Sequence, residues 1–318
     1  MNAVLIMCHK NIEQVKMLVN RCLSENTRII IHFDKRMQIN KQELQDIQNL
    51  GVYFTEERVC GELDTRSLVD ISMAMVLRAK EIENLENIRF KYYLLLSGQD
   101  YPIKPISYIN NELEKMYPTP FIDCTPYSND NWIYHKFSRT KELLRFHNWV
   151  TKNIPKKSIM YPLRVFSRIV EKVGKKIVRI FHITDYHKMH RAGIDLYGGS
   201  AWWILPDIAI DYICKEYNST FSKKLLNTYT PEETYFQTMV MRSDVKDLVA
   251  VNPPDMVAQN CKTWAYFEDI GKPFKGHPYI FTVDEYDKLT SSDRWFARKF
   301  DITVDSNIFG LLNSFLGE

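Results

Sequence analysis

Most of the short motifs that mark enzymes of known mechanism are missing from this sequence of 318 residues. It contains no P-loop, no G-x-G-x-x-G, no G-x-S-x-G and no H-E-x-x-H. Their absence argues against P-loop nucleotide hydrolysis, dinucleotide-dependent redox chemistry, serine hydrolysis from a nucleophile elbow and zinc-dependent proteolysis. Any catalytic function must therefore depend on residues that none of these motifs marks.

Three other features are scarce. The six cysteines are scattered and never form C-x-x-C, so they fit neither a zinc site nor a disulfide framework. The net charge is only +3, which argues against dedicated nucleic-acid binding. No apolar run approaches the length of a membrane span, and the apolar start is too short for a signal peptide. We therefore expect a cytoplasmic protein that would meet a membrane only from the cytosolic face.

The first half of the chain alternates short apolar runs with helical patterns. The runs AVLIMC, RIIIHFD and YYLLLSG begin at Ala3, Arg28 and Tyr92, and each has the length and composition of a buried strand. Apolar residues at helical spacing lie between them, most clearly over residues 67–82. This alternation predicts an α/β fold of the Rossmann type, in which helices flank a mostly parallel sheet within one large domain.

Polar residues stand where these strands are expected to end. Ligands of open α/β sheets bind at the carboxyl ends of the strands, so position alone makes each of these residues a site candidate. They are His9, His32, Asp34, Gln99 and Asp100.

The segment 151–191 differs in composition from the rest of the chain, because it has eleven Lys or Arg against two acidic residues. Over about 157–181, apolar residues from Leu163 to Ile180 keep helical spacing and basic residues fill much of the remainder. This pattern predicts a basic amphipathic helix. Such a helix could pack its apolar face on the core, or it could attach the protein to anionic lipid.

The stretch TPEE, Thr230 to Glu233, precedes an amphipathic pattern and has two interpretations. T-x-x-E with proline at the first helical position is a capping box, in which Glu233 would bond to its own backbone. A carboxylate at a helix N-terminus is also kept ionised, which suits a general base. A side chain folded back on its own backbone could not reach a substrate, so the two roles compete.

Asp-x-Asp is also absent. Nucleotide-sugar transferases on α/β sheets commonly use that pair to hold a divalent metal on the diphosphate. The protein therefore either does not handle nucleotide diphosphates or neutralises them with fixed cations. In either case we expect no metal site and no cofactor.

Seven segments, in order from about residue 3 to residue 301, resemble the core-2/I-branching β-1,6-N-acetylglucosaminyltransferases and the related peptide O-xylosyltransferases. They are IMCHKN, IIIHFDKR, YYLLLSGQDYPIKP, LYGGSAWWIL, TPEETYFQTM, WAYFED and WFARKFD. The resemblance implies a GT-A-like fold and an inverting, metal-independent glycosyltransferase with a UDP-sugar donor. It implies a nucleotide-sugar-binding half at 1–125, and an acceptor-binding and catalytic half at 126–318.

The resemblance also implies roles for the charged candidates. Glu233 matches the glutamate of an S-P-D-E motif that acts as catalytic base, with Glu232 as the alternative. Lys299 of ARKFD matches a lysine that contacts the diphosphate, and Arg298 lies beside it; a surface basic pair is the alternative. Asp34 matches a strand-end aspartate that helps to hold the uridine, unless it only terminates a turn.

His9 should flank the uridine pocket. Asp100 could touch the donor or only organise its loop through backbone hydrogen bonds.

The chain departs from the family in two places. A second diphosphate-binding arginine is replaced by Gly276, for which Lys275, His277 or Arg294 could substitute. A W-G-G-x-S stretch of many bacterial relatives is replaced by LDTRS, which ends at Ser67. Both departures concern the recognition of the donor nucleotide.

On the acceptor side, WAYFED matches a W-x-Y-F-E stretch whose aromatic residues contact the acceptor sugar, here Trp264 and Tyr266. Aromatic faces pack well on sugar C–H surfaces, although alternate aromatics also occur on half-buried strands. Gly199 and Ser200 of YGGSAWW would approach the ligand through backbone and hydroxyl, or the glycines would simply form a turn.

We expect a bacterial transferase that moves N-acetylglucosamine from a UDP-sugar to a glycan or lipid-linked oligosaccharide, in cell-surface polysaccharide synthesis and with a peripheral inner-membrane contact. UDP-xylose is the alternative donor. Two alternatives outside catalysis are a glycan-binding protein of the same fold and a nucleotide-dependent regulator.

Overall fold

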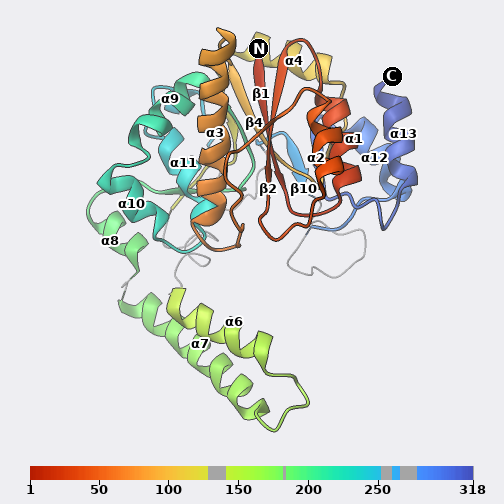
Figure 1. Cartoon of the computed structure of the whole chain (residues 1–318). Helices are drawn as coiled ribbons and strands as arrows, with labels where there is room; N and C mark the ends of the chain where they lie inside the picture. Colours follow the sequence, from red (N-terminus) through yellow and green to blue (C-terminus); the bar gives the residue numbers. More distant parts are fainter. Residues whose placement is uncertain (128–140, 182–183, 252–259, 266–277, 318) are drawn as a thin grey trace.

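The computed structural model describes residues 1–127, 141–181, 184–251, 260–265 and 278–317. Its centre is a six-stranded sheet in the order β3-β2-β1-β4-β9-β6 (Figure 1). β1 pairs in parallel with β2 and β4, and β2 with β3, whereas β9 runs antiparallel to β4 and β6. The expected α/β fold with a mostly parallel sheet is confirmed. The strands are β1 (Asn2–Cys8), β2 (Thr27–Phe33), β3 (Tyr53–Phe54), β4 (Tyr92–Ser97), β6 (Phe121–Ile122) and β9 (Trp203–Pro206).

Helices cover both faces of this sheet. Successive side chains of β1 point to opposite faces, so Ala3 and Leu5 pack in one apolar core, whereas Val4 and Ile6 pack in the other. The first core lies under α3 (Ser67–Glu86), α9 (Asp207–Glu216) and α11 (Tyr235–Val240). The second lies under α1 (Ile12–Cys22), α4 (Ile106–Met116) and α13 (Asn307–Leu316). Two buried faces explain why the first strands are apolar throughout rather than alternating.

Two small sheets flank the central one. A three-stranded sheet has the order β10-β11-β5, and in it β11 (Phe296–Arg298) is parallel to β10 (Thr263–Ala265) and antiparallel to β5 (Asp100–Pro102). The other sheet pairs β7 (Thr125–Pro126) with β8 (Tyr197–Gly198). β5 follows β4 directly, so the three-stranded sheet stands at the carboxyl edge of the central sheet.

The remaining short elements connect these layers. They are α2 (Lys41–Gln48), α8 (Asp185–Arg191), α10 (Thr220–Leu226), η1 (Pro231–Glu233), η2 (Lys246–Leu248), η3 (Val283–Glu285) and α12 (Tyr286–Ser291).

Within the basic segment, α7 (Tyr161–Phe181) forms a helical hairpin with the preceding α6 (Lys141–Asn153), and this hairpin extends away from the sheet and its helices in Figure 1. The predicted helix is confirmed in α7. Its apolar face does not pack on the core, however, because Phe166, Ile169 and Val173 remain 55%, 54% and 51% exposed. Among the helices of the described residues, none combines the length and the apolar character needed to span a bilayer.

Candidate functional site

Three of the predicted site residues come from strand ends at the carboxyl edge of the sheet. His9 follows β1, Asp34 follows β2, and Asp100 begins β5 after β4 ends at Ser97. The antiparallel register of β5 and β11 sets Asp100 opposite Arg298. This pairing brings the carboxyl-terminal ARKFD segment to the same edge, as expected for ligand binding in an open α/β sheet.

Arg298 is the buried cation of this edge, with only 7% of its surface exposed. Its Nε atom lies 3.6 Å from Asp100 Oδ1, and its guanidinium carbon lies 3.9 Å from the centroid of the Trp202 ring. Within the described part of the chain, Nε and Nη1 have no hydrogen-bond partner. Because buried guanidinium N–H groups are costly when unpaired, these atoms indicate a place where an anion would be bound.

Positive charge accumulates around Arg298. Lys299 is half-buried, and its pKa is lowered first by burial and then by the charges of Arg298 and Lys10. Lys10 Nζ forms an ion pair of 2.5 Å with Asp301. The pKa of His9 is lowered by desolvation and then by Lys10 and Lys299, although its side chain lies exposed at the strand end. The charges of Lys10 and Arg298 contribute to the lowered pKa of both Lys299 and His9, so these groups share one neighbourhood, which can hold a polyanion.

The Asp34 carboxylate accepts hydrogen bonds from its own loop and from the loop that precedes α3. Its Oδ1 accepts hydrogen bonds of 2.9 Å from the backbone N–H and the Nε of Arg36, and its Oδ2 accepts one of 2.8 Å from the Gly61 N–H. The Arg36 guanidinium keeps the pKa of this carboxyl well below its usual range. Asp34 is therefore ionised and joins the end of β2 to the loop that precedes α3.

Asp100 is fully buried, with no exposed side-chain surface. Its two oxygens accept hydrogen bonds from the backbone N–H and the hydroxyl of Ser97, at 2.8 and 2.7 Å. Burial raises its pKa, and the charge of Arg298 opposes that rise. Of the two roles considered for Asp100, these contacts support organising the loop and balancing the charge of Arg298, and direct contact with the donor stays a prediction.

The segment that carries Glu233 differs from a capping box. Pro231–Glu233 is a short 3₁₀-helix, Thr230 has a positive φ of 48°, and its side chain makes no capping hydrogen bond. The capping interpretation is therefore wrong. Glu233 is half-buried, and its backbone carbonyl accepts a hydrogen bond of 2.9 Å from the Gly199 N–H. The structure thus joins the TPEE and YGGS segments.

Glu232 has a different environment, with only 6% of its surface exposed. Its Oε1 accepts a hydrogen bond of 2.8 Å from the backbone N–H of Asp64, which lies in the LDTRS segment. In the described residues, its buried Oε2 has no hydrogen-bond partner. Burial raises the pKa of this carboxyl to about 7. Glu232 therefore connects two loops, and Glu233 is the more accessible of the two glutamates.

Gly199 lies where no other residue fits without movement. A Cβ atom at this position would stand 1.9 Å from the carbonyl oxygen of Asp123. The next residue, Ser200, accepts a hydrogen bond of 2.6 Å at its carbonyl oxygen from the Gln237 side chain. Close backbone packing therefore explains why residue 199 is a glycine. Three residues further along the chain is Trp202, whose ring lies against Arg298.

Trp264, an expected acceptor contact, is half-buried on β10, and its ring centroid lies 5.2 Å from that of Phe281. Tyr266, Lys275, Gly276 and His277 lie outside the described residues. The acceptor role of these aromatic residues stays a prediction.

Arg294, the remaining candidate to replace the missing family arginine, lies 3.4 Å from Asp293.

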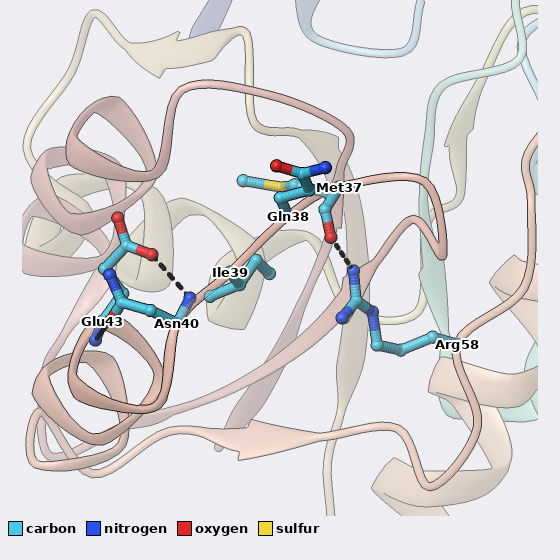
Figure 2. A pocket seen from close by; sticks show the side chains of 6 residues that line it. All are labelled: Met37, Gln38, Ile39, Asn40, Glu43 and Arg58. Atoms are coloured by element: carbon cyan, nitrogen blue, oxygen red, sulfur yellow. Dashed lines mark hydrogen bonds between the residues drawn. The ribbon is translucent and has the colours of Figure 1, made fainter.

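A separate open hollow of about 600 Å³ lies beside the loop that follows β2 and is shown in Figure 2. Arg58 connects it to the site, because its Nη2 donates to the carbonyl oxygens of Asp34 and Met37. At the opposite rim, the Asn40 N–H donates a hydrogen bond of 2.8 Å to Glu43 (Figure 2). Through Arg58, this hollow borders the loop that holds Asp34. Its lining residues are Met37, Gln38, Ile39, Asn40, Glu43 and Arg58.

Sequence reasoning did not assign three residues that organise this edge. Lys10 follows the predicted His9 directly, and Arg36 follows Asp34 by two residues, so proximity to a strand end would have indicated both. Asp123 has no such signal, because its importance arises from its contact with Gly199. Trp202 belongs to the YGGSAWW segment, where pocket size near Gly199 and Trp202 is expected to separate the two candidate donors; the sequence does not predict its contact with Arg298. As for metal ligands, the described residues contain no group of three His, Cys, Asp or Glu that could hold an ion.

Comparison with known proteins identifies the class. The chain is 23% identical over 333 residues to the "Beta-1,3-galactosyl-O-glycosyl-glycoprotein beta-1,6-N-acetylglucosaminyltransferase 4" of Danio rerio, covering 98% of this chain and 69% of that protein. It is 24% identical over 328 residues to "Xylosyltransferase 2" of Canis lupus familiaris, covering 98% of this chain but only 33% of that protein. A solved cytidylyltransferase structure from Leptospira borgpetersenii matches with 13% identity over 55% of this chain and 73% of that one, at a TM-score of 0.23.

The two transferase relatives and the family model together define a glycosyltransferase. The family model described as "Core-2/I-Branching enzyme" matches residues 3–289. The chain belongs to this family.

Proposed function

We propose that the protein is an inverting, metal-independent glycosyltransferase that moves a sugar from a UDP-sugar to a hydroxyl of a glycan. N-acetylglucosamine is the favoured sugar, since the zebrafish relative is named as an N-acetylglucosaminyltransferase. The observation that carries the proposal is the buried Arg298, whose Nε and Nη1 lack partners among the described residues. With Lys299 and Lys10 nearby, it supports a fixed-cation site for a diphosphate.

The reaction assigns one role to each part of the site. Glu233 takes the proton of the acceptor hydroxyl as that oxygen forms a bond to the anomeric carbon of the donor. The bond from that carbon to the diphosphate oxygen breaks at the same time, and its electron pair leaves with UDP. Arg298 and Lys299 stabilise the charge that develops on the diphosphate. Attack from the face opposite the leaving group inverts the anomeric configuration.

The first test is calorimetric titration of UDP and of several UDP-sugars in EDTA, on the wild type and on Lys299→Ala. We expect binding in the chelator and a loss of about tenfold or more in the variant, which removes one charge-assisted contact. Binding that requires Mn²⁺ or Mg²⁺ would contradict the metal-independent mechanism. Absence of binding by any UDP-sugar would contradict the donor class.

UDP-xylose is a second donor candidate, because another relative is named as a xylosyltransferase. The same titration separates the two donors, since the preferred one should bind more tightly and release UDP when an acceptor is supplied. Binding of a UDP-sugar without turnover on any glycan would favour a binding protein of the same fold.

The setting of the reaction forms the rest of the proposal. A cytoplasmic location, a role in cell-surface polysaccharide synthesis and a peripheral contact with the membrane would bring the enzyme to a lipid-linked acceptor. Fractionation of cells that produce the full chain would test this location, and recovery from the periplasm would contradict it.

A further inference from the structure

The α6–α7 hairpin exposes an apolar surface that no described residue covers. Four large side chains on α7 are between 44% and 55% exposed, and together they form what we call the docking face: Phe166, Ile169, Val173 and Ile177. Their spacing of three or four residues places them on one side of the helix. At the turn between the helices, Ile159 is 97% exposed and Met160 is 53% exposed. Monomeric soluble proteins rarely expose such a contiguous apolar surface without a function.

The packing of the hairpin fixes which side of α7 this surface occupies. Ser167 is buried, and its hydroxyl lies 3.0 Å from Nδ1 of His147 on α6. Glu171, one turn further along, lies 4.0 Å from Nε2 of the same His147. Ser167 and Glu171 therefore mark the side of α7 that faces α6. The docking face lies beside this seam, and none of the residues that the structure describes covers it.

Basic residues border the docking face on the side away from α6. Arg168, Lys172 and Lys176 are exposed and recur every four residues, and we call them the basic edge. In the sequence, residues 141–181 contain eleven Lys or Arg and two acidic residues, whereas the whole chain has a net charge of only +3. Positive charge is therefore concentrated on the hairpin, and the rest of the chain is net negative.

We propose that the α6–α7 hairpin is a membrane-docking element whose occupant is the surface of an anionic lipid bilayer. The docking face enters the boundary between headgroups and acyl chains, while the basic edge contacts the negatively charged headgroups. A second copy of the chain fits less well, because pairing two hairpins through this face would bring two strongly basic helices together. Nucleic acid would satisfy the cations but would leave the large apolar side chains in water.

This inference rests on and deepens the peripheral membrane contact of the proposed function. It stands independently of the proposed reaction, because it concerns where the protein binds rather than what it transfers. If both hold, docking would hold the enzyme at the surface that carries a lipid-linked acceptor. Failure of vesicle binding would leave the UDP-sugar titration unaffected, and failure of that titration would leave vesicle binding unaffected.

The test is sedimentation of the full chain with vesicles of phosphatidylcholine alone and of phosphatidylcholine with phosphatidylglycerol. Three proteins are compared: the wild type, a docking-face variant with Ile169→Asn and Val173→Asn, and a basic-edge variant with Arg168→Gln, Lys172→Gln and Lys176→Gln. We expect the wild type to bind the anionic vesicles and to release them as salt is raised. The docking-face variant should lose about tenfold in affinity, and the basic-edge variant about 100-fold.

Matched controls separate the surface from general effects of substitution. Leu77→Asn with Leu85→Asn changes two exposed apolar residues on α3, and Lys215→Gln with Lys223→Gln and Lys224→Gln removes three exposed charges from α9 and α10. Both controls should bind vesicles like the wild type, and all variants should keep the helical circular dichroism spectrum. Equal recovery of the wild type with and without anionic lipid would overturn the proposal. So would a wild-type dimer that the docking-face variant dissociates, since a second copy would then cover the face.

Discussion

The guanidinium carbon of Arg298 lies 3.9 Å from the centroid of the Trp202 ring, while Asp100 approaches its Nε to 3.6 Å. A cation over an indole face is attracted by the ring quadrupole, and the planar guanidinium can stack where an ammonium cannot. Trp202 therefore orients the Arg298 plane, and Asp100 balances its charge. The remaining N–H groups are thereby kept in a defined direction before any anion arrives, which is the arrangement that favours electrostatic catalysis.

This geometry predicts that Arg298→Lys weakens UDP binding by about tenfold, or about 1.4 kcal/mol, even though the charge is retained. The lysine loses the stacked plane and the bidentate donor geometry. Calorimetric titration of UDP measures the effect, and Arg191→Lys, which changes an exposed residue at the end of α8, is the control. An unchanged dissociation constant would show that Arg298 does not contact the nucleotide.

Substitution of each of the two adjacent glutamates should affect activity differently. Glu233→Gln is expected to lower kcat by about 10²–10⁴-fold, because the general base is lost, while UDP affinity stays unchanged. Glu232→Gln keeps an oxygen that can accept from the Asp64 N–H and should retain most of the activity. UDP release in the presence of an acceptor measures both. If Glu232→Gln proves the more damaging of the two, the assignment of the base is reversed.

The sequence predicts the central sheet well because its strands are buried on both faces. The runs that begin at Ala3, Arg28 and Tyr92 become β1, β2 and β4, and the periodic stretch at 67–82 becomes α3. Local composition decides these elements, since only an apolar strand can lie between two layers of helices. The basic amphipathic pattern likewise predicts α7.

Contacts between distant segments could not be predicted in this way. T-x-x-E fits a capping box, yet Thr230 adopts a left-handed conformation and the following turn is a 3₁₀-helix. The hydrogen bond between Glu232 and the Asp64 N–H joins residues 168 positions apart in the sequence, and no local pattern encodes it. The apolar face of α7 has the pattern of a core-packing helix, and only the fold reveals that the hairpin extends away from the core.

Glu232 also makes stability depend on pH. Burial raises its pKa from 4.5 to about 7, so the folded state prefers the protonated carboxyl. Its stabilising contribution is fully present below pH 4.5 and is lost as the pH rises towards 7. Glu232→Gln, which stays neutral, should therefore gain free energy of unfolding relative to the wild type across this range, reaching about 3 kcal/mol at pH 8.

Urea unfolding of both proteins at pH 5 and pH 8 measures this difference. Glu62→Gln is the control, because Glu62 lies exposed in the same loop as Asp64. Its substitution should change stability equally at both pH values. A difference between Glu232→Gln and the wild type that stays constant from pH 5 to pH 8 would mean that Glu232 does not titrate in this range.

Two glycine substitutions with opposite expected effects on stability test how closely the backbone packs beside Glu233. Gly199→Ala would place a Cβ 1.9 Å from the Asp123 carbonyl oxygen, so the β8–β9 loop must move, at a cost of about 1–3 kcal/mol. That movement would also displace the Glu233 carbonyl, which accepts from the Gly199 N–H. We therefore expect a loss of activity as well as of stability.

Gly310→Ala is the matched change in α13, where a Cβ meets no atom within 4 Å. Alanine is favoured over glycine inside a helix, so this variant should be more stable by about 0.5–1 kcal/mol and fully active. Thermal unfolding and UDP release measure both variants in parallel. If Gly199→Ala kept wild-type stability, the loop would have space for a Cβ atom, contrary to the structure. If it also kept wild-type activity, the close contact between the YGGS and TPEE segments could not be what positions the base.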